Sequence, residues 1–147
     1  MDRGEPIGTV ILVSNDGVRF SLPWKSALVS GLLVEMIENE DDEHVIPLPN
    51  ISSDMLLKVV SFCECYSAKP FDNIERPLRC GDLGKLVGED YAKLVELDKK
   101  SLFSIIEASN YMDIKPLLDL ASARVALNIR GMCPDEIGEY FGLVNHN

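Results

Sequence analysis

The sequence predicts an α+β fold, a small sheet near the N-terminus packed with many helices. Two short runs of β-branched or alternating apolar residues flank Asp16-Gly17, which is the pattern of a β-hairpin. A third short apolar run covers residues 45–48. From Ser52 onwards the apolar residues recur mainly three and four positions apart, and this spacing is typical of amphipathic helices.

The expected hairpin joins a strand at residues 9–13 to a strand at residues 18–22. The second run alternates apolar and polar side chains, which predicts that one face of the strand is buried. Pro23 ends this strand, and residues 24–37 have a mainly helical pattern. Because Gly31 weakens a helix by about 1 kcal/mol relative to alanine, a break there is an alternative to one continuous helix.

Residues 38–43 contain five acidic side chains in six positions, and this composition predicts a solvated loop. The run at 45–48 is expected to form a short edge strand, because Pro47 and Pro49 remove hydrogen-bond donors from the ladder. Ser52 or Ser53 is then the expected N-cap of a largely buried helix.

Residues 67–88 contain prolines and glycines scattered among charged residues, which predicts a long surface loop. A helical pattern resumes from about residue 89 to residue 96. Asp98 is the expected N-cap of the next helix, whose side chains up to Met112 are almost entirely apolar. That composition predicts a central helix buried on several sides.

Two further helices are expected at the C-terminal end of the chain. Asp113 is the expected N-cap of the first, Pro116 lies in its first turn, and Gly131 ends it. Pro134 begins a last short helix with acidic residues in its first turn, where carboxylates favour the positive end of the helix dipole.

The 147 residues include 14 basic and 24 acidic side chains, which gives a formal net charge of −10. This charge opposes binding to phosphate backbones, so no direct nucleic-acid partner is expected. The apolar stretches are too short to span a bilayer, and the first residues lack the pattern of a secretory signal. We therefore expect a soluble intracellular protein with no membrane partner.

No cluster of residues predicts catalysis, a cofactor or a metal site. Cys63 and Cys65 lie about 200° apart around the axis of their expected helix, so they cannot converge on one ion. They, Cys80 and Cys133 are expected to be reduced structural thiols. Physical reasoning from the residues alone ends at an intracellular α+β domain that binds other molecules and is not an enzyme.

Several segments resemble the Skp family, the S-phase-kinase-associated adaptors of SCF-type cullin–RING ubiquitin ligases, which have a BTB/POZ fold. The stretch Asn-Tyr-Met-Asp-Ile-Lys at residues 110–115 is the most specific. The order and spacing of the matches cover the chain from about Thr9 to Leu143. The matching segments are residues 10–20, 45–50, 102–103, 108–119, 129–131 and 134–137.

The resemblance implies a non-catalytic adaptor that bridges a cullin to F-box substrate receptors in ubiquitin-dependent degradation. The RING protein and the E2 enzyme would be indirect partners, and the assembly would accelerate the reaction by proximity. A cytoplasmic and nuclear location is expected, and a homodimer is possible when no partner is bound. No cofactor is implied.

The resemblance also implies residue roles. Asn110 and Tyr111 would lie at the cullin surface, and a tyrosine suits an interface because its ring is buried while its hydroxyl stays at the rim. Apolar residues of the last two helices would bind the F-box, although sequence cannot divide them between core and interface. The candidates are Leu117, Val125, Ile129, Pro134, Ile137 and Phe141.

The resemblance divides the chain into four parts: a flexible N-terminus at 1–8, a BTB/POZ core at 9–113 with a long loop at about 67–88, F-box-binding helices at 114–143 and a tail at 144–147. Cys133 replaces the family's capping threonine, which is expected to cost around 1 kcal/mol. The sequence ends at Asn147, where the family continues into an acidic terminal helix with a Trp-Cys motif, so a smaller F-box surface is expected.

Two alternatives remain open at this point. One is a divergent adaptor similar to elongin C, which would bind receptors other than F-box proteins. The other is a BTB/POZ scaffold that associates with itself and has no role in a ligase.

Overall fold

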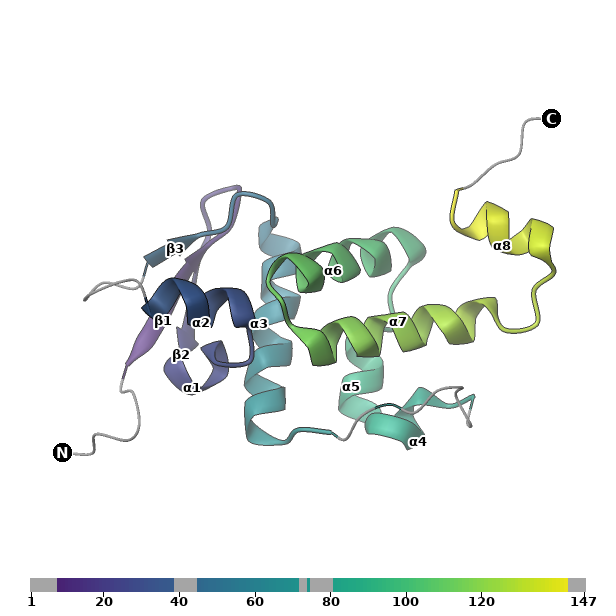
Figure 1. The fold of residues 1–147 in the computed structure, drawn as a ribbon, viewed down its shortest axis with the longest axis horizontal. Coiled ribbons are helices and arrows are strands. Elements are labelled where there is room, and N and C mark those ends of the chain that lie inside the picture. Colours follow the sequence, from purple (N-terminus) through teal and green to yellow (C-terminus); the bar gives the residue numbers. More distant parts are fainter. Residues whose placement is uncertain (1–7, 39–44, 72–73, 75–80, 143–147) are drawn as a thin grey trace.

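The computed structural model describes residues 8–38, 45–71, 74 and 81–142. Most of the predicted acidic loop, the first seven residues of the predicted N-terminal segment, the predicted tail and Cys80 lie outside these residues. Within them, three strands lie at one end of the molecule and helix α8 (Pro134–Tyr140) lies at the other (Figure 1). The predicted α+β class is confirmed.

The predicted hairpin is present. Strand β1 (Thr9–Val13) pairs in antiparallel register with β2 (Arg19–Pro23), and Gly17 adopts a φ of +84° in the turn between them. Strand β3 (Val45–Pro47) pairs in parallel with the other side of β1 and is a short edge strand, as the prolines around it predicted. The sheet of the described residues therefore has the order β2-β1-β3.

The segment predicted as one helix, or as a helix broken near Gly31, contains two helices, α1 (Trp24–Ala27) and α2 (Gly31–Glu38). The first two amides of α2 bond to the chain at the end of a distant helix, since Gly31 N donates to Asp113 O at 2.9 Å and Leu32 N donates to Met112 O at 3.1 Å. Because these long-range bonds satisfy the amides, α2 begins there as a separate helix.

Helix α3 (Ser53–Ala68) runs through the centre of the molecule (Figure 1). Its predicted cap is confirmed, because the Ser52 hydroxyl accepts a hydrogen bond from Met55 N at 3.3 Å. Its buried side chains, spaced mostly three and four positions apart, contact the sheet on one side and helix α6 (Lys99–Tyr111) on the other. They are Leu56, Val59, Val60, Phe62 and Cys63.

The prediction of an unbroken loop over 67–88 was wrong. The end of α3 enters this range, and helix α4 (Leu83–Val87) begins after Asp82, whose carboxylate accepts a hydrogen bond from Gly84 N at 3.0 Å. Helix α5 (Glu89–Leu94) follows at once. Gly88 joins the two with a φ of +106°, a conformation that side chains rarely adopt, so two short helices form where the glycines indicated a loop.

Helices α6 and α7 (Lys115–Ile129) pack against each other as an antiparallel pair, and α8 follows them (Figure 1). Asp98 caps α6 as predicted, because its carboxylate accepts a hydrogen bond from Ser101 N at 3.4 Å. Gly131, with a φ of +87°, follows the end of α7 as expected.

One continuous hydrophobic cluster extends from the sheet through α3 and α6 into α7. It includes Val10 and Leu12 of β1 as well as Leu117, Leu120 and Ala121 of α7. The predicted boundary at residue 113 therefore does not separate two hydrophobic cores.

Candidate partner-binding surfaces

The hairpin turn is tied to the start of α3 by Asp16. The Asp16 carboxylate accepts hydrogen bonds from the Ser53 hydroxyl at 2.7 Å, from Ser53 N at 3.0 Å and from the Ser14 hydroxyl at 2.5 Å. Hydrogen bonds from the Ser14 and Ser53 hydroxyls are the main reason that the pKa of Asp16 is lowered. Asn15 N also donates to Ile51 O at 2.8 Å. The turn and the first residues of α3 thus form one connected surface.

The predicted cullin residues Asn110 and Tyr111 lie at the C-terminal end of α6, and both are exposed. The Tyr111 side chain keeps 37% of its surface exposed, whereas the next residue, Met112, is fully buried. The ring therefore stands on a segment that is anchored in the core.

The prediction of Asp113 as an N-cap was wrong. Asp113 adopts a φ of +56°, and the residue at the N-cap of α7 is Ile114, which makes no side-chain capping bond. Because the Asp113 carbonyl accepts a hydrogen bond from Gly31 N, tertiary contact with α2 sets the backbone here in place of a local cap.

Ser30 also joins the start of α2 to the end of α6. Its side chain is fully buried, and its hydroxyl donates to Met112 O at 2.6 Å and accepts from Leu33 N at 3.2 Å. The start of α2 and the end of α6 are thereby held together directly beneath Asn110 and Tyr111.

A hollow of about 420 Å³ lies beside Tyr111, between the end of α6 and the start of α3. Polar side chains and the apolar side chains of Ile51, Met55 and Ala108 line it together, which is the mixture found at protein interfaces. Its lining residues are Asn15, Asn50, Ile51, Ser52, Met55, Ser104, Glu107, Ala108 and Tyr111.

The predicted F-box residues divide into two groups. Leu117 is fully buried and Val125 keeps only 8% of its surface exposed, so in this structure both are internal packing residues of α7. The remaining four reach the surface of α7, the following turn and α8. Ile129 and Ile137 are half-buried, Pro134 is exposed, and Phe141 keeps 38% of its surface exposed.

An aromatic cluster joins α8 to α6. The Phe103 ring of α6 stacks on Phe141 with centroids 5.8 Å apart, and it meets Tyr140 edge to face at 5.8 Å. The Tyr140 hydroxyl accepts a hydrogen bond from Asn128 Nδ2 at 3.0 Å, and Lys99 Nζ lies 5.4 Å from the Tyr140 ring centroid. We call Phe103, Tyr140 and Phe141 the aromatic cluster.

Sequence reasoning missed Phe103 and Tyr140 as members of this surface. Phe103 lies in a helix whose side chains are nearly all apolar, so it could not be distinguished from core residues. Only the proximity of α8 to α6 shows that the Phe103 ring belongs to the same surface as Phe141.

The start of α8 is stabilised from within the helix. Cys133 N donates to the Glu136 carboxylate at 3.0 Å, which is one half of a capping box. The weak cap expected at Cys133 is therefore supplemented by Glu136.

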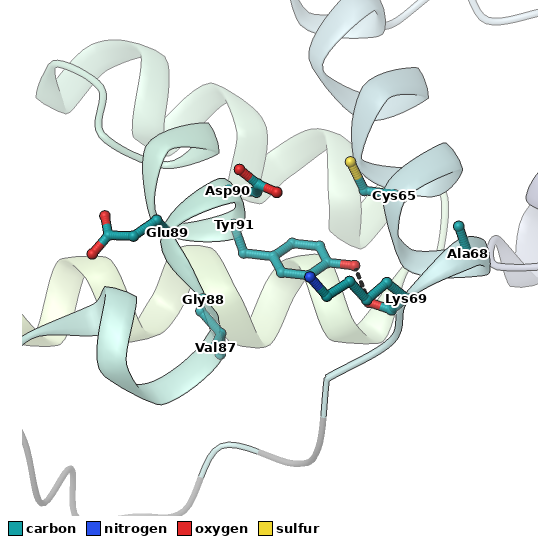
Figure 2. A pocket seen from close by; sticks show the side chains of 8 residues that line it. All are labelled: Cys65, Ala68, Lys69, Val87, Gly88, Glu89, Asp90 and Tyr91. Carbon is teal, nitrogen blue, oxygen red and sulfur yellow. Dashed lines mark hydrogen bonds between the residues drawn. The ribbon is translucent and has the colours of Figure 1, made fainter.

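A separate cavity of about 360 Å³ lies between the end of α3 and α5 (Figure 2). Tyr91 lies across it, and its hydroxyl donates to Lys69 O at 2.6 Å. Burial, with smaller contributions from Cys65, Tyr66 and Asp90, raises the pKa of Tyr91 to about 12, so the phenol stays protonated. Tyr91 therefore fastens α5 to the end of α3.

The described residues contain no group of three or more His, Cys, Asp or Glu side chains able to hold a metal ion. No helix among them has the length and hydropathy needed to cross a membrane.

The chain matches the Skp1 family twice, its tetramerisation (POZ) domain over residues 8–68 and its dimerisation domain over residues 115–146. It is 38% identical to the S-phase kinase-associated protein 1 homolog of Tetrahymena thermophila, over 99% of this chain and 87% of that protein. It is 37% identical to suppressor of kinetochore protein 1 of Schizosaccharomyces pombe, over 91% and 84%.

A third relative carries a functional name. The E3 ubiquitin ligase complex SCF subunit sconC of Emericella nidulans is 35% identical, over 92% of this chain and 84% of that protein. The family matches cover both the sheet with α3 and the last two helices, and the identity extends along nearly the whole chain. The chain therefore belongs to the Skp1 family.

Proposed function

We propose that this chain is the adaptor subunit of an SCF-type E3 ubiquitin ligase and bridges a cullin to F-box substrate receptors. The relatives named as SCF subunits support this role, since they match the chain over most of its length. The chain itself carries out no reaction in this proposal. It holds a receptor near the RING protein and the E2 enzyme that the cullin brings, so that catalysis gains from proximity.

On the cullin side, the proposed contact residues are Asn110 and Tyr111. Their support is geometric: both side chains are exposed, and the backbone beneath them is fixed by Ser30 and Met112. A large ring on a rigid base loses little conformational entropy on binding, and this property is common among interface residues that contribute most to affinity.

On the receptor side, the proposed surface comprises Ile129, Pro134, Ile137 and Phe141, together with the rest of the aromatic cluster. Leu117 and Val125 support this surface from inside α7 and are not proposed to touch the F-box. The aromatic residues of the two surfaces are separated along α6, because Tyr111 is its last residue and Phe103 is its fifth, about 12 Å away along the axis. In this proposal both partners bind at once.

Tyr111 supports the proposal most directly, because its exposed aromatic ring precedes Met112, which is fully buried in the core. We expect Tyr111→Lys to abolish binding of the cullin N-terminal region while F-box binding is retained. The matched control is Leu86→Lys on α4, since Leu86 is equally exposed at 37%. Affinity purification with each variant measures both partners, and retained cullin binding by Tyr111→Lys would contradict the assigned surface.

We also propose a cytoplasmic and nuclear location, which the resemblance to the Skp family implies. Imaging of the fluorescently tagged chain in its own cells tests it, and exclusion from either compartment would contradict it.

A further inference from the structure

A second hollow of about 420 Å³ continues the one beside Tyr111. Ser52, Met55 and Ser104 line both hollows, so together they form one groove along the start of α3 and the face of α6. We call it the α3–α6 groove. The residues that line its second half are Ser52, Asp54, Met55, Leu57, Lys58, Lys100, Ser101 and Ser104.

Both ends of the α3–α6 groove expose apolar surface. Tyr111 lies at one end, and at the other end Leu57 keeps 55% of its side chain exposed, the largest exposed fraction among the large apolar residues that the structure describes. Met55, half-buried, lies between them and lines both halves. Burial of these side chains supplies the apolar part of an interface.

The two halves of the α3–α6 groove differ in the sign of their charge. Glu107 is the one charged residue among the described residues that line the half beside Tyr111. The other half carries Lys58 and Lys100 against a single acid, Asp54. The groove is therefore negative at the Tyr111 end and carries an excess of positive charge at the Leu57 end.

Neither Glu107 nor the two lysines forms an ion pair or side-chain hydrogen bond with another residue in the described part of the chain. Their charges are available to a partner. In a chain with a net charge of −10, two lysines that line one hollow also depart locally from the overall sign of the charge. Complementary charges at such positions set the orientation of a partner and reject competitors of the wrong sign.

We propose that the α3–α6 groove receives a cullin segment with ordered charges, a basic residue over Glu107 and an acidic residue over Lys58 and Lys100, with an apolar side chain between them on Met55. This inference rests on the proposed function and extends its cullin surface from Asn110 and Tyr111 along the groove. Glu107 and the lysine pair thus determine which cullin the chain accepts and in which direction the segment lies.

The test reverses the charge at each end of the groove. We expect Glu107→Lys and the double variant Lys58→Glu with Lys100→Glu each to weaken binding of the cullin N-terminal region at least tenfold, with a larger loss at low salt than at high salt. The controls make the same charge changes on exposed residues elsewhere, Glu64→Lys on α3 and the double variant Lys85→Glu on α4 with Lys93→Glu on α5. Equal thermal unfolding midpoints establish that the variants fold alike.

A rescue experiment identifies the partner's basic residue. Single Lys→Glu and Arg→Glu variants of the cullin region are tested against Glu107→Lys, and we expect one of them to restore the affinity. If no cullin variant rescues, or if the groove variants bind like their controls while Tyr111→Lys still abolishes binding, the charge order is overturned and the adaptor function stands. If the wild-type chain binds no cullin, the proposed function fails and this inference fails with it.

Discussion

Tyr91 holds two helices together through a single hydroxyl. Its hydrogen bond to Lys69 O joins α5 to the end of α3, and its ring contacts Phe62 and Phe71 edge to face with centroids 5.7 and 4.8 Å apart. Because the ring is almost fully buried, loss of its proton is disfavoured in the folded chain and not in the unfolded chain.

This difference predicts an alkaline loss of stability. An unfolded tyrosine has its usual pKa of 10.0, whereas the folded pKa is about 12, so between these values the unfolded chain releases the proton first. The contribution of Tyr91 is complete below pH 10 and declines by about 2 to 3 kcal/mol as pH rises to 12.

The comparison with Tyr91→Phe isolates this effect. We expect the substitution to lower the free energy of unfolding at pH 8 by about 1 kcal/mol, because the Lys69 carbonyl loses its partner. Urea unfolding from pH 8 to pH 11 measures both proteins. The free energies of unfolding of the two proteins should converge as pH rises, and a constant difference between them would contradict the raised pKa of Tyr91. The Cys63 thiol, whose pKa burial raises to about 12, is present in both proteins and cancels.

Ser30 supports the segment below Asn110 and Tyr111. We expect Ser30→Ala to lower the free energy of unfolding by about 1 to 2 kcal/mol, since Leu33 N loses its acceptor in a buried site. It should also weaken cullin binding although Ser30 lies below the surface. The control is Ser21→Ala on the exposed edge of β2. Thermal unfolding and a cullin titration check both effects, and a variant as stable as Ser21→Ala would contradict the buried junction.

Residue-scale prediction from sequence succeeded where the interaction is local. The caps at Ser52 and Asp98 bond to amides three residues ahead, so the nearby sequence contains both partners. It failed at Asp113, whose backbone conformation depends on Gly31, far away in the sequence. A cap determined by tertiary contact leaves no local pattern.

At the scale of elements, α8 is the helix whose packing matters most to the receptor surface. No residue of α8 is buried, so its position depends on the aromatic cluster and on the Asn128 contact. A helix of seven residues is also too short to be stable alone. The order of α8 should therefore respond to changes at Phe103.

We expect Phe103→Ala to release α8. Loss of two aromatic contacts, each worth about 0.5 to 1.5 kcal/mol beyond buried area, should raise amide hydrogen exchange throughout residues 134–141. Affinity for an F-box receptor should fall, while cullin binding is unchanged. The control is Ile106→Ala, a half-buried apolar residue of the same helix that lies outside the aromatic cluster. Unchanged exchange in α8 would contradict the role of the cluster.

Short helices were the elements that sequence predicted least well. The glycines at 84 and 88 favoured a loop, yet Asp82 begins α4 and the left-handed Gly88 separates it from α5. The longer helices α3, α6 and α7 were predicted well, because each repeats its apolar spacing over several turns.

At the scale of the whole molecule, one core supports two exposed surfaces. The sequence predicted Leu117, Val125 and Phe141 alike as apolar positions of the last two helices, and it could not divide them between core and interface. Leu117 and Val125 lie inside because α6 covers that side of α7, whereas Phe141 remains half open at the end of the chain that the structure describes. Such a division depends on which helices are neighbours.

In the proposed assembly, this chain bridges a cullin and an F-box receptor. The most direct measurement is reconstitution from the purified chain, a cullin N-terminal region and an F-box protein, followed by size-exclusion chromatography. We predict a ternary complex that forms with the chain, does not form without it, and loses only the cullin when Tyr111→Lys replaces the wild type. Binding of one partner that excludes the other, or a complex that forms without the chain, would contradict the bridge.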